Sequence, residues 1–191
     1  MSVFNFPEIV LASQSPRRQE LLRAAGINFE IRAANTAEKI PAGMNPHEVP
    51  AFLAEEKAAA VAQHAPAEKW ILAADTLVLL NNEFIGKPAS LEEAAMMLRK
   101  LSGNMHKVIT GVCLMRGAEK KFLTDITRVF FRTLNEETIQ HYITHYEVLD
   151  KAGAYAIQEW IGLIGVEKIE GDYFNVMGLP VSRVVEMLRG I

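Results

Sequence analysis

The run from Trp70 to Leu80 constrains the fold more than any other part of the chain. Its side chains are apolar except for Asp75 and the adjoining Thr76, and this pattern is typical of a strand. A carboxylate within so apolar a run is costly unless it is paired or binds a cation. The run therefore predicts a strand that presents a functional carboxylate, the alternative being an aspartate that only forms a turn.

Short apolar runs alternate with stretches of helical periodicity along the rest of the chain, which indicates an α/β fold. Half of the 191 residues are hydrophobic, enough for the core of one domain, residues 1–191, compact or drawn out into two lobes. The expected strands are 9–12, 29–33, 70–80, 83–85, 107–116, 121–132 and 166–169, and the expected helices are 16–25, 45–63, 90–102, 135–146 and 180–189.

Composition limits the partners and the compartment. A formal charge of −3 argues against a general electrostatic attraction to nucleic acid. The single cysteine, Cys113, excludes an internal disulfide, and its apolar neighbours predict a core side chain. No apolar run reaches the roughly 18 residues of a membrane helix, and the first residues lack the features of a signal peptide. We therefore expect a cytoplasmic protein without a membrane partner.

The segment Ser13-Gln14-Ser15-Pro16-Arg17-Arg18 lies between an expected strand and an expected helix. Backbone N–H groups at a helix start, two hydroxyls and two guanidinium groups together can bind phosphate oxygens. Arg17 and Arg18 oppose the helix dipole, which favours a compensating anion. The alternative is a capped helix with two solvated arginines, and local chemistry leaves both interpretations open.

A second cation candidate is Lys87 in Gly86-Lys87-Pro88. The motif ends like a phosphate-binding Walker loop, but Asn81 and Pro88 stand where that loop needs a glycine and a hydroxyl. Lys87 can still place one positive charge on a phosphate. As exposed charges, Arg18 and Lys87 are expected to contribute little to stability.

Taken in order along the chain, these motifs resemble the Maf family of nucleoside triphosphate pyrophosphatases, from about Ile9 to Leu188. The segments that carry the resemblance are Ser13-x-Ser15-Pro16-Arg17-Arg18, Glu55-Glu56-Lys57-Ala58, Ala74-Asp75-Thr76, Gly86-Lys87-Pro88, Leu101-Ser102-Gly103, Thr110-Gly111, Asp150-Lys151-Ala152-Gly153-Ala154-Tyr155-Ala156-Ile157-Gln158, Ile169-Glu170-Gly171 and Asn175-Val176-x-Gly178-Leu179-Pro180.

The resemblance implies an enzyme that hydrolyses a nucleoside triphosphate between the α- and β-phosphates, with a divalent metal (Mg²⁺ or Mn²⁺), and that forms a homodimer. It implies a mixed, twisted sheet with flanking helices in two lobes around a cleft, like inosine triphosphate pyrophosphatases. The residues that it places in the active site are Asp75, Lys57 and Lys87 in catalysis, Ser13, Arg17, Arg18, Thr76 and Gln158 in substrate binding, and Glu38 and Asp75 as metal ligands.

Three positions resemble the branch of the family that acts on dTTP and UTP: Arg17, Thr76 and Gln158. The branch that acts on 7-methyl-GTP has tryptophan, glutamine and glutamate there. An amide both donates and accepts, as the edge of uracil or thymine requires. We therefore expect hydrolysis of dTTP, UTP and modified pyrimidine nucleotides. The sequence leaves open whether the role is house-cleaning of modified nucleotides or arrest of cell division.

Two departures from the family pattern accompany the candidate site. Asn35-Thr36-Ala37, just before Glu38, replaces two usual aspartates, and Glu159 replaces the glycine that usually follows the glutamine. Asp75 is either the base that activates water or the ligand of a metal that does so, and the sequence leaves both open.

Two rival functions remain. One is an aspartyl-phosphate phosphatase, which usually needs a second aspartate where this chain has Leu77. The other is a non-catalytic, nucleotide-sensing regulator of cell division or septum formation. Asp75 favours catalysis over sensing, because a pure binding protein needs the cations more than the base.

Overall fold

The computed structural model describes residues 6–34, 36 and 39–191. Its contacts divide the chain into two compact units. The first unit contains the N-terminal part up to Thr76, together with Thr110–Asp125 and Gly178–Ile191, and the second contains Leu77–Ile109 and Ile126–Met177.

The strands form a seven-stranded mixed sheet in the order β2-β1-β3-β5-β6-β7, with β4 paired to β3. β1 is parallel to β2 and β3, whereas β4 is antiparallel to β3 and β7 to β6. This arrangement confirms the predicted α/β class. The bounds are β1 Ile9–Leu11, β2 Phe29–Ile31, β3 Trp70–Leu80, β4 Glu83–Ile85, β5 Met105–Arg116, β6 Glu119–Phe131 and β7 Val166–Glu170.

The hairpin that follows β3 turns at Asn81 and Asn82, as their type predicted. Both have positive φ, 49° and 66°, which is the geometry of a type I′ turn and suits asparagine. Leu80 then pairs directly with Glu83.

The helices are α1 Pro16–Ala24, α2 Val49–Ala62, α3 Leu91–Leu101, α4 Glu136–His145, α5 Trp160–Gly165, α6 Tyr173–Met177 and α7 Val181–Arg189, with a 3₁₀ turn, η1, at Ala152–Ala154. The predicted start of α2 was wrong. Asn45 accepts from the backbone N–H of His47 at 3.0 Å and so forms a separate turn, and the helix begins only at Val49. The short α5 and α6 were not expected. No helix in the described part of the chain combines the length and apolar character needed to cross a membrane.

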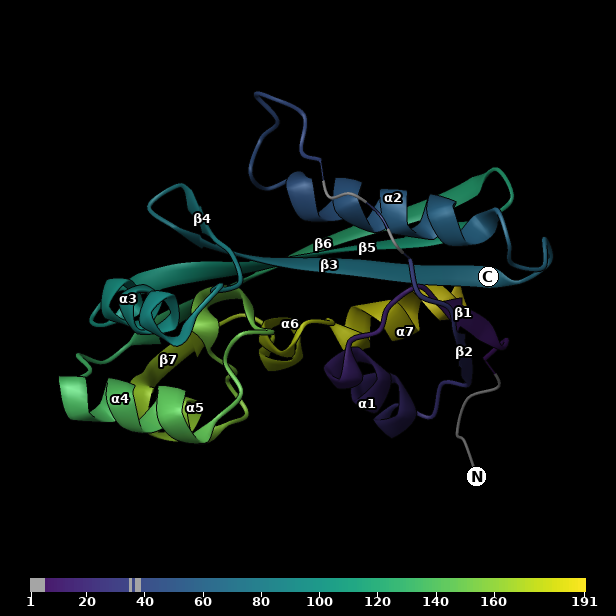
Figure 1. The fold of residues 1–191 in the computed structure, drawn as a ribbon. Coiled ribbons are helices and arrows are strands. Elements are labelled where there is room, and N and C mark those ends of the chain that lie inside the picture. The colour runs from purple at the N-terminus through teal and green to yellow at the C-terminus, as the bar shows by residue number, and fades with distance from the viewer. Residues whose placement is uncertain (1–5, 35, 37–38) are drawn as a thin grey trace. The chain divides into compact units, whose positions relative to one another are not determined.

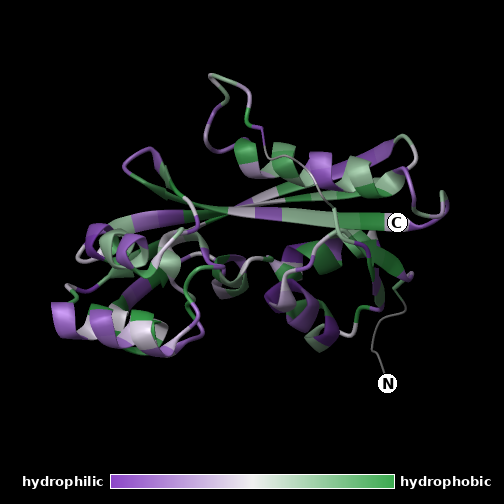
Figure 2. Ribbon diagram, viewed as in Figure 1, coloured by the Kyte–Doolittle hydropathy of each residue, from purple (hydrophilic) through white to green (hydrophobic). Residues whose placement is uncertain are grey.

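In the first unit, α2 covers one face of the strands, and α1 and α7 cover the other (Figure 1). Small side chains of α2, Ala54 and Ala58 among them, pack on Ile71, Ala73 and Cys113 of the sheet. Burial raises the pKa of the Cys113 thiol to about 12, which fits the core role expected of it. Figure 2 shows how strongly apolar β3 is.

The second unit has its own core, in which α3, α4 and α5 pack on the strands. Its helix starts follow the sequence signals. The Ser90 hydroxyl accepts from the N–H of Glu93 at 3.2 Å, and Asn135 accepts from that of Thr138 at 2.8 Å. Such caps satisfy backbone donors that the first turn leaves unpaired.

Candidate active site

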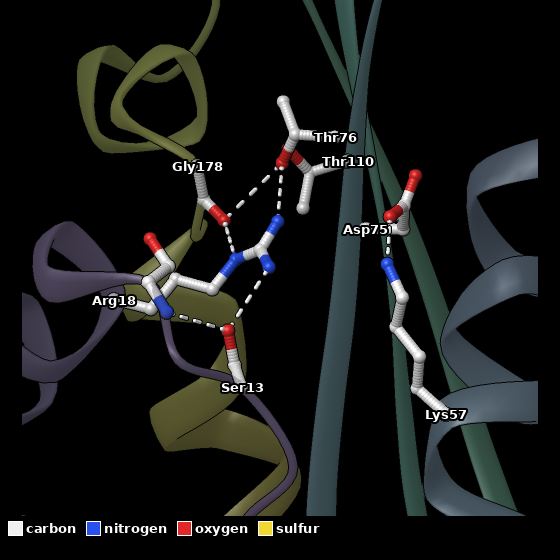
Figure 3. Close-up of polar contacts among 8 residues, drawn as sticks. Ser13, Arg18, Lys57, Asp75, Thr76, Thr110 and Gly178 are labelled. Atoms are coloured by element: carbon white, nitrogen blue, oxygen red, sulfur yellow. Dashed lines mark hydrogen bonds and ion pairs between the residues drawn. The ribbon is translucent and has the colours of Figure 1, made fainter. Parts of the chain in front are cut away.

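Asp75 lies within β3 with only 7% of its surface exposed. The ammonium group of Lys57, on the facing helix α2, donates a hydrogen bond to Asp75 Oδ1 (Figure 3). The pair offsets the cost of burying either charge alone. The turn alternative for Asp75 is therefore wrong, because the strand continues through it to Leu80.

A close approach between backbones places Lys57 within reach of the carboxylate. At Gly111 of β5, a Cβ atom would lie 2.1 Å from the backbone nitrogen of Ala51 on α2. Only glycine allows this approach without displacing the helix. Gly111 thus lets α2 lie against the sheet.

Thr76 points to the opposite face of β3 from Asp75, as adjacent residues of a strand do (Figure 3). Its hydroxyl lies 2.9 Å from that of Thr110 and accepts a hydrogen bond from Arg18 Nη2 at 3.0 Å. Arg18 also donates from Nε to the Gly178 carbonyl at 2.8 Å, and from Nη1 to the Ser13 hydroxyl at 3.3 Å. Arg18 is thus half-buried and bonded, which corrects the expectation of an exposed charge.

The start of α1 supplies further donors beside Arg18. The side chain of Ser15 does not cap the helix. The backbone N–H of Ser15 donates to the Ser13 hydroxyl at 3.2 Å. No acidic residue occupies the first turn, where Arg17 and Arg18 stand. The positive end of the helix dipole and two guanidinium groups therefore coincide, and this combination suits an anion.

The second unit contains the two remaining described candidates, Lys87 and Gln158, both exposed. Their segments are bonded to each other, because the N–H of Gly153 donates to the carbonyl of Gly86 at 2.9 Å. The segment that leads to Gln158 is therefore attached to the motif that carries Lys87.

A buried histidine also contacts the segment that leads to Gln158. His106, on β5, is fully buried, and its Nε2 lies 2.7 Å from the hydroxyl of Tyr155. Both rings pack on Phe131, with centroids 5.4 and 5.0 Å away. Burial lowers the pKa of His106 to about 4 and raises that of Tyr155, so both rings are neutral near pH 7.

The structure thus brings together Ser13, Arg18 and Thr76 on one face of β3, and Lys57 with Asp75 on the other. Thr110 and the Gly178 carbonyl join the first group, although the sequence analysis assigned them no role. Both residues lie in segments that carry the family resemblance, and this was the sequence feature that could have identified them. Glu38, the predicted second metal ligand, lies outside the described residues.

The profile of one family, described as Maf-like protein, matches residues 8–191. The chain belongs to the Maf family.

Relatives within the Maf family are similar over nearly the whole chain. A dTTP/UTP pyrophosphatase of Cytophaga hutchinsonii is 50% identical, with 95% of this chain and 83% of the relative covered. Proteins of the same name from Phocaeicola vulgatus and Bacteroides fragilis are 46% and 44% identical, with 95% of both chains covered in each comparison. Five of the motifs that indicated the Maf family, those that contain Arg18, Lys57, Asp75, Thr110 and Gly178, supply the contacts around Asp75 and Thr76 of β3.

Proposed function

We propose that this protein is a nucleoside triphosphate pyrophosphatase that hydrolyses dTTP and UTP to the monophosphate and pyrophosphate. One observation carries the proposal. At consecutive positions of β3, Asp75 contacts an ammonium group on one face and Thr76 contacts a guanidinium group on the other. The names of the relatives support the same activity.

The described cations suit a substrate with about four negative charges. In the first unit, we assign Arg17, Arg18 and the Ser13 hydroxyl to the phosphate oxygens. Lys57 orients the Asp75 carboxylate, and Asp75 would either take the proton of the attacking water or hold a divalent cation. The new oxygen–phosphorus bond forms as the bond between the α- and β-phosphates breaks, and pyrophosphate leaves.

Among the described residues, the Asp75 carboxylate is the oxygen ligand that we propose for a divalent cation. These residues contain no group of three or more His, Cys, Asp or Glu side chains that could hold a metal. Among the described residues, Asp75 is the candidate carboxylate ligand, and Mg²⁺ accepts a single protein carboxylate when substrate phosphates and waters complete its shell. We keep Glu38 as the proposed second ligand. A bound cation would neutralise phosphate charge and lower the pKa of the attacking water.

In the second unit, we assign Lys87 to a phosphate and Gln158 to the pyrimidine base. We further propose that residues 1–191 act as one domain, since β3, β5 and β6 each contribute residues to both units. We expect a cytoplasmic homodimer that acts on small nucleotides and on neither nucleic acid nor membranes. Light scattering of the purified protein tests the dimer.

The decisive experiment is a panel of triphosphates with product separation. UTP, dTTP, CTP, ATP, GTP and 7-methyl-GTP are incubated with the protein and Mg²⁺ or Mn²⁺, and pyrophosphate is resolved from phosphate. We expect pyrophosphate and monophosphate, fastest from UTP and dTTP. Release of phosphate would indicate a phosphatase, and binding without turnover would indicate a nucleotide sensor that regulates division. An Asp75→Asn preparation measures contaminating activity.

A further inference from the structure

A tight turn presents Gln158 to solvent. The N–H of Glu159 donates to the carbonyl of Ala156 at 3.1 Å, which puts Ile157 and Gln158 at the two central positions. Ile157 is 6% exposed and faces the core, whereas Gln158 is exposed. The orientation of Gln158 therefore depends on whatever holds this turn.

One hydroxyl group holds both ends of the turn. Tyr142, fully buried on α4, accepts at its hydroxyl from the N–H of Ala156 at 3.2 Å. The same hydroxyl donates to Glu159 Oε2. Burial and the neighbouring Glu159 carboxylate raise the pKa of Tyr142, so the hydroxyl keeps the proton that it donates.

The second oxygen of Glu159 is also engaged. Lys151 is only 4% exposed, and its ammonium lies 3.3 Å from Glu159 Oε1 and 2.8 Å from Asp150 Oδ1. It also donates to the carbonyl of Glu147. Because the two oxygens of Glu159 have different partners, the carboxylate is fixed in position at the end of the turn.

Helix α5 also contacts the turn, in addition to Tyr142 and Lys151. A Cβ atom at Gly162 would lie 1.8 Å from the carbonyl oxygen of Ile157, so the turn and the helix are in direct backbone contact. The N–H of Gly162 donates to the carbonyl of Glu159 at 2.9 Å. The turn cannot shift toward α5 without a clash.

We infer that Tyr142 and Glu159 are positioning residues that act through Gln158 and set the selectivity for pyrimidine nucleotides. This inference rests on the proposed function. In this chain the side-chain bond fixes the turn before the nucleotide arrives, so less freedom is lost when Gln158 pairs with the base.

The test measures selectivity rather than activity alone. Tyr142→Phe removes only the hydroxyl, and Glu159→Ala removes its partner. We expect each to lower the ratio of kcat/KM for UTP over GTP at least fivefold, mainly through a higher KM for UTP. Glu159→Gln keeps an acceptor for Tyr142 and should retain the ratio within twofold. Glu167→Gln, on the exposed part of β7, is the matched control.

Two further readouts separate positioning from a structural role. Tyr142 and Glu159 act through one shared hydrogen bond. The double variant should therefore have a UTP-to-GTP ratio of kcat/KM no lower than that of the less selective single variant. Amides of residues 155–160 should exchange hydrogen faster in both single variants without nucleotide.

Two outcomes overturn the inference, and a third bears on the proposed function. A selective wild-type protein whose two variants keep its UTP-to-GTP ratio overturns it, even if their melting temperatures fall. Unchanged amide exchange at residues 155–160 overturns it as well. Failure of the wild-type protein to release pyrophosphate from UTP or dTTP removes the proposed function itself, and that result precedes any variant.

Discussion

Lys57 on α2 and Asp75 on β3 form an ion pair in which only 15% and 9% of the two side chains are exposed. Removal of either partner would leave a charge in a poorly solvated place. The next residue of the strand, Thr76, contacts Arg18 on the opposite face. Consecutive residues of β3 therefore hold the carboxylate and contact the cationic group that we assign to phosphate binding, on opposite faces of the strand.

Asp75→Asn should fold and lose at least about a hundredfold in kcat, the usual scale for removal of a general base. The asparagine oxygen can still accept the hydrogen bond from Lys57. The Lys57 ammonium loses its counter-charge, however, so the melting temperature should fall while the protein still folds. Asp125→Asn breaks another ion pair of the same unit, with Arg183 at 3.0 Å, and should leave kcat unchanged. Near-normal pyrophosphate release by a folded Asp75→Asn protein would refute the assignment.

Arg18→Ala should lose both substrate affinity and stability. The variant leaves the Gly178 carbonyl and the hydroxyls of Ser13 and Thr76 without this donor, at a cost of about 1–3 kcal/mol. For a chain of this size, that lowers Tm by roughly 3–9 °C. Lys87→Ala removes an exposed cation and should raise KM with little change in Tm. Calorimetry and initial rates on both variants check the contrast.

Gln158→Glu should impair hydrolysis of UTP and dTTP. A carboxylate cannot donate to a base carbonyl. Gln158 is exposed in the free protein, but a polar group left unmatched once the base covers it costs about 1–3 kcal/mol, roughly tenfold or more in kcat/KM. Rates with GTP in the same variant are the internal reference. An unaltered order of substrates would show that Gln158 only anchors its turn.

His106 should make stability depend on pH in acid. Its pKa is about 4 in the folded protein and about 6.5 when unfolded, so the unfolded chain takes up a proton first as the pH falls. Stability is fully present above pH 6.5 and is lost by up to about 3 kcal/mol between pH 6.5 and pH 4. Urea unfolding of wild type and His106→Gln across this range measures the difference, and parallel curves would contradict it.

Gly111→Ala should displace α2, since its Cβ would lie 2.1 Å from the backbone of Ala51. Overpacking of this kind costs about 1–3 kcal/mol. Because α2 carries Lys57, kcat should fall as well. At Gly190 an added Cβ meets nothing nearer than 3.6 Å, so Gly190→Ala is the control and should match the wild type in both measurements.

Local chemistry in the sequence was enough to predict much of the fold. Apolar runs predicted the strands, Asn81 and Asn82 predicted the hairpin turn, and Ser90 and Asn135 predicted two helix starts. Each of these signals acts within a few residues, through side-chain burial, backbone φ or a cap. The start of α2 was wrong because Asn45 bonds to its own turn, and a local motif cannot distinguish that turn from a helix cap.

The candidate site could be described only from the sequence and the tertiary structure together. The residue types proposed for it, including Asp75, Arg18 and Gln158, followed from the sequence and the family resemblance. Proton transfer calls for a carboxylate, phosphate binding for cations, and recognition of a pyrimidine base for an amide. The partners of those residues did not follow in this way. Arg18 bonds to Gly178, 160 positions away, and Glu159, just before α5, bonds to Tyr142 on α4. Such contacts arise from the packing of distant segments, which brings side chains together regardless of their separation along the chain, so only the tertiary structure decided them.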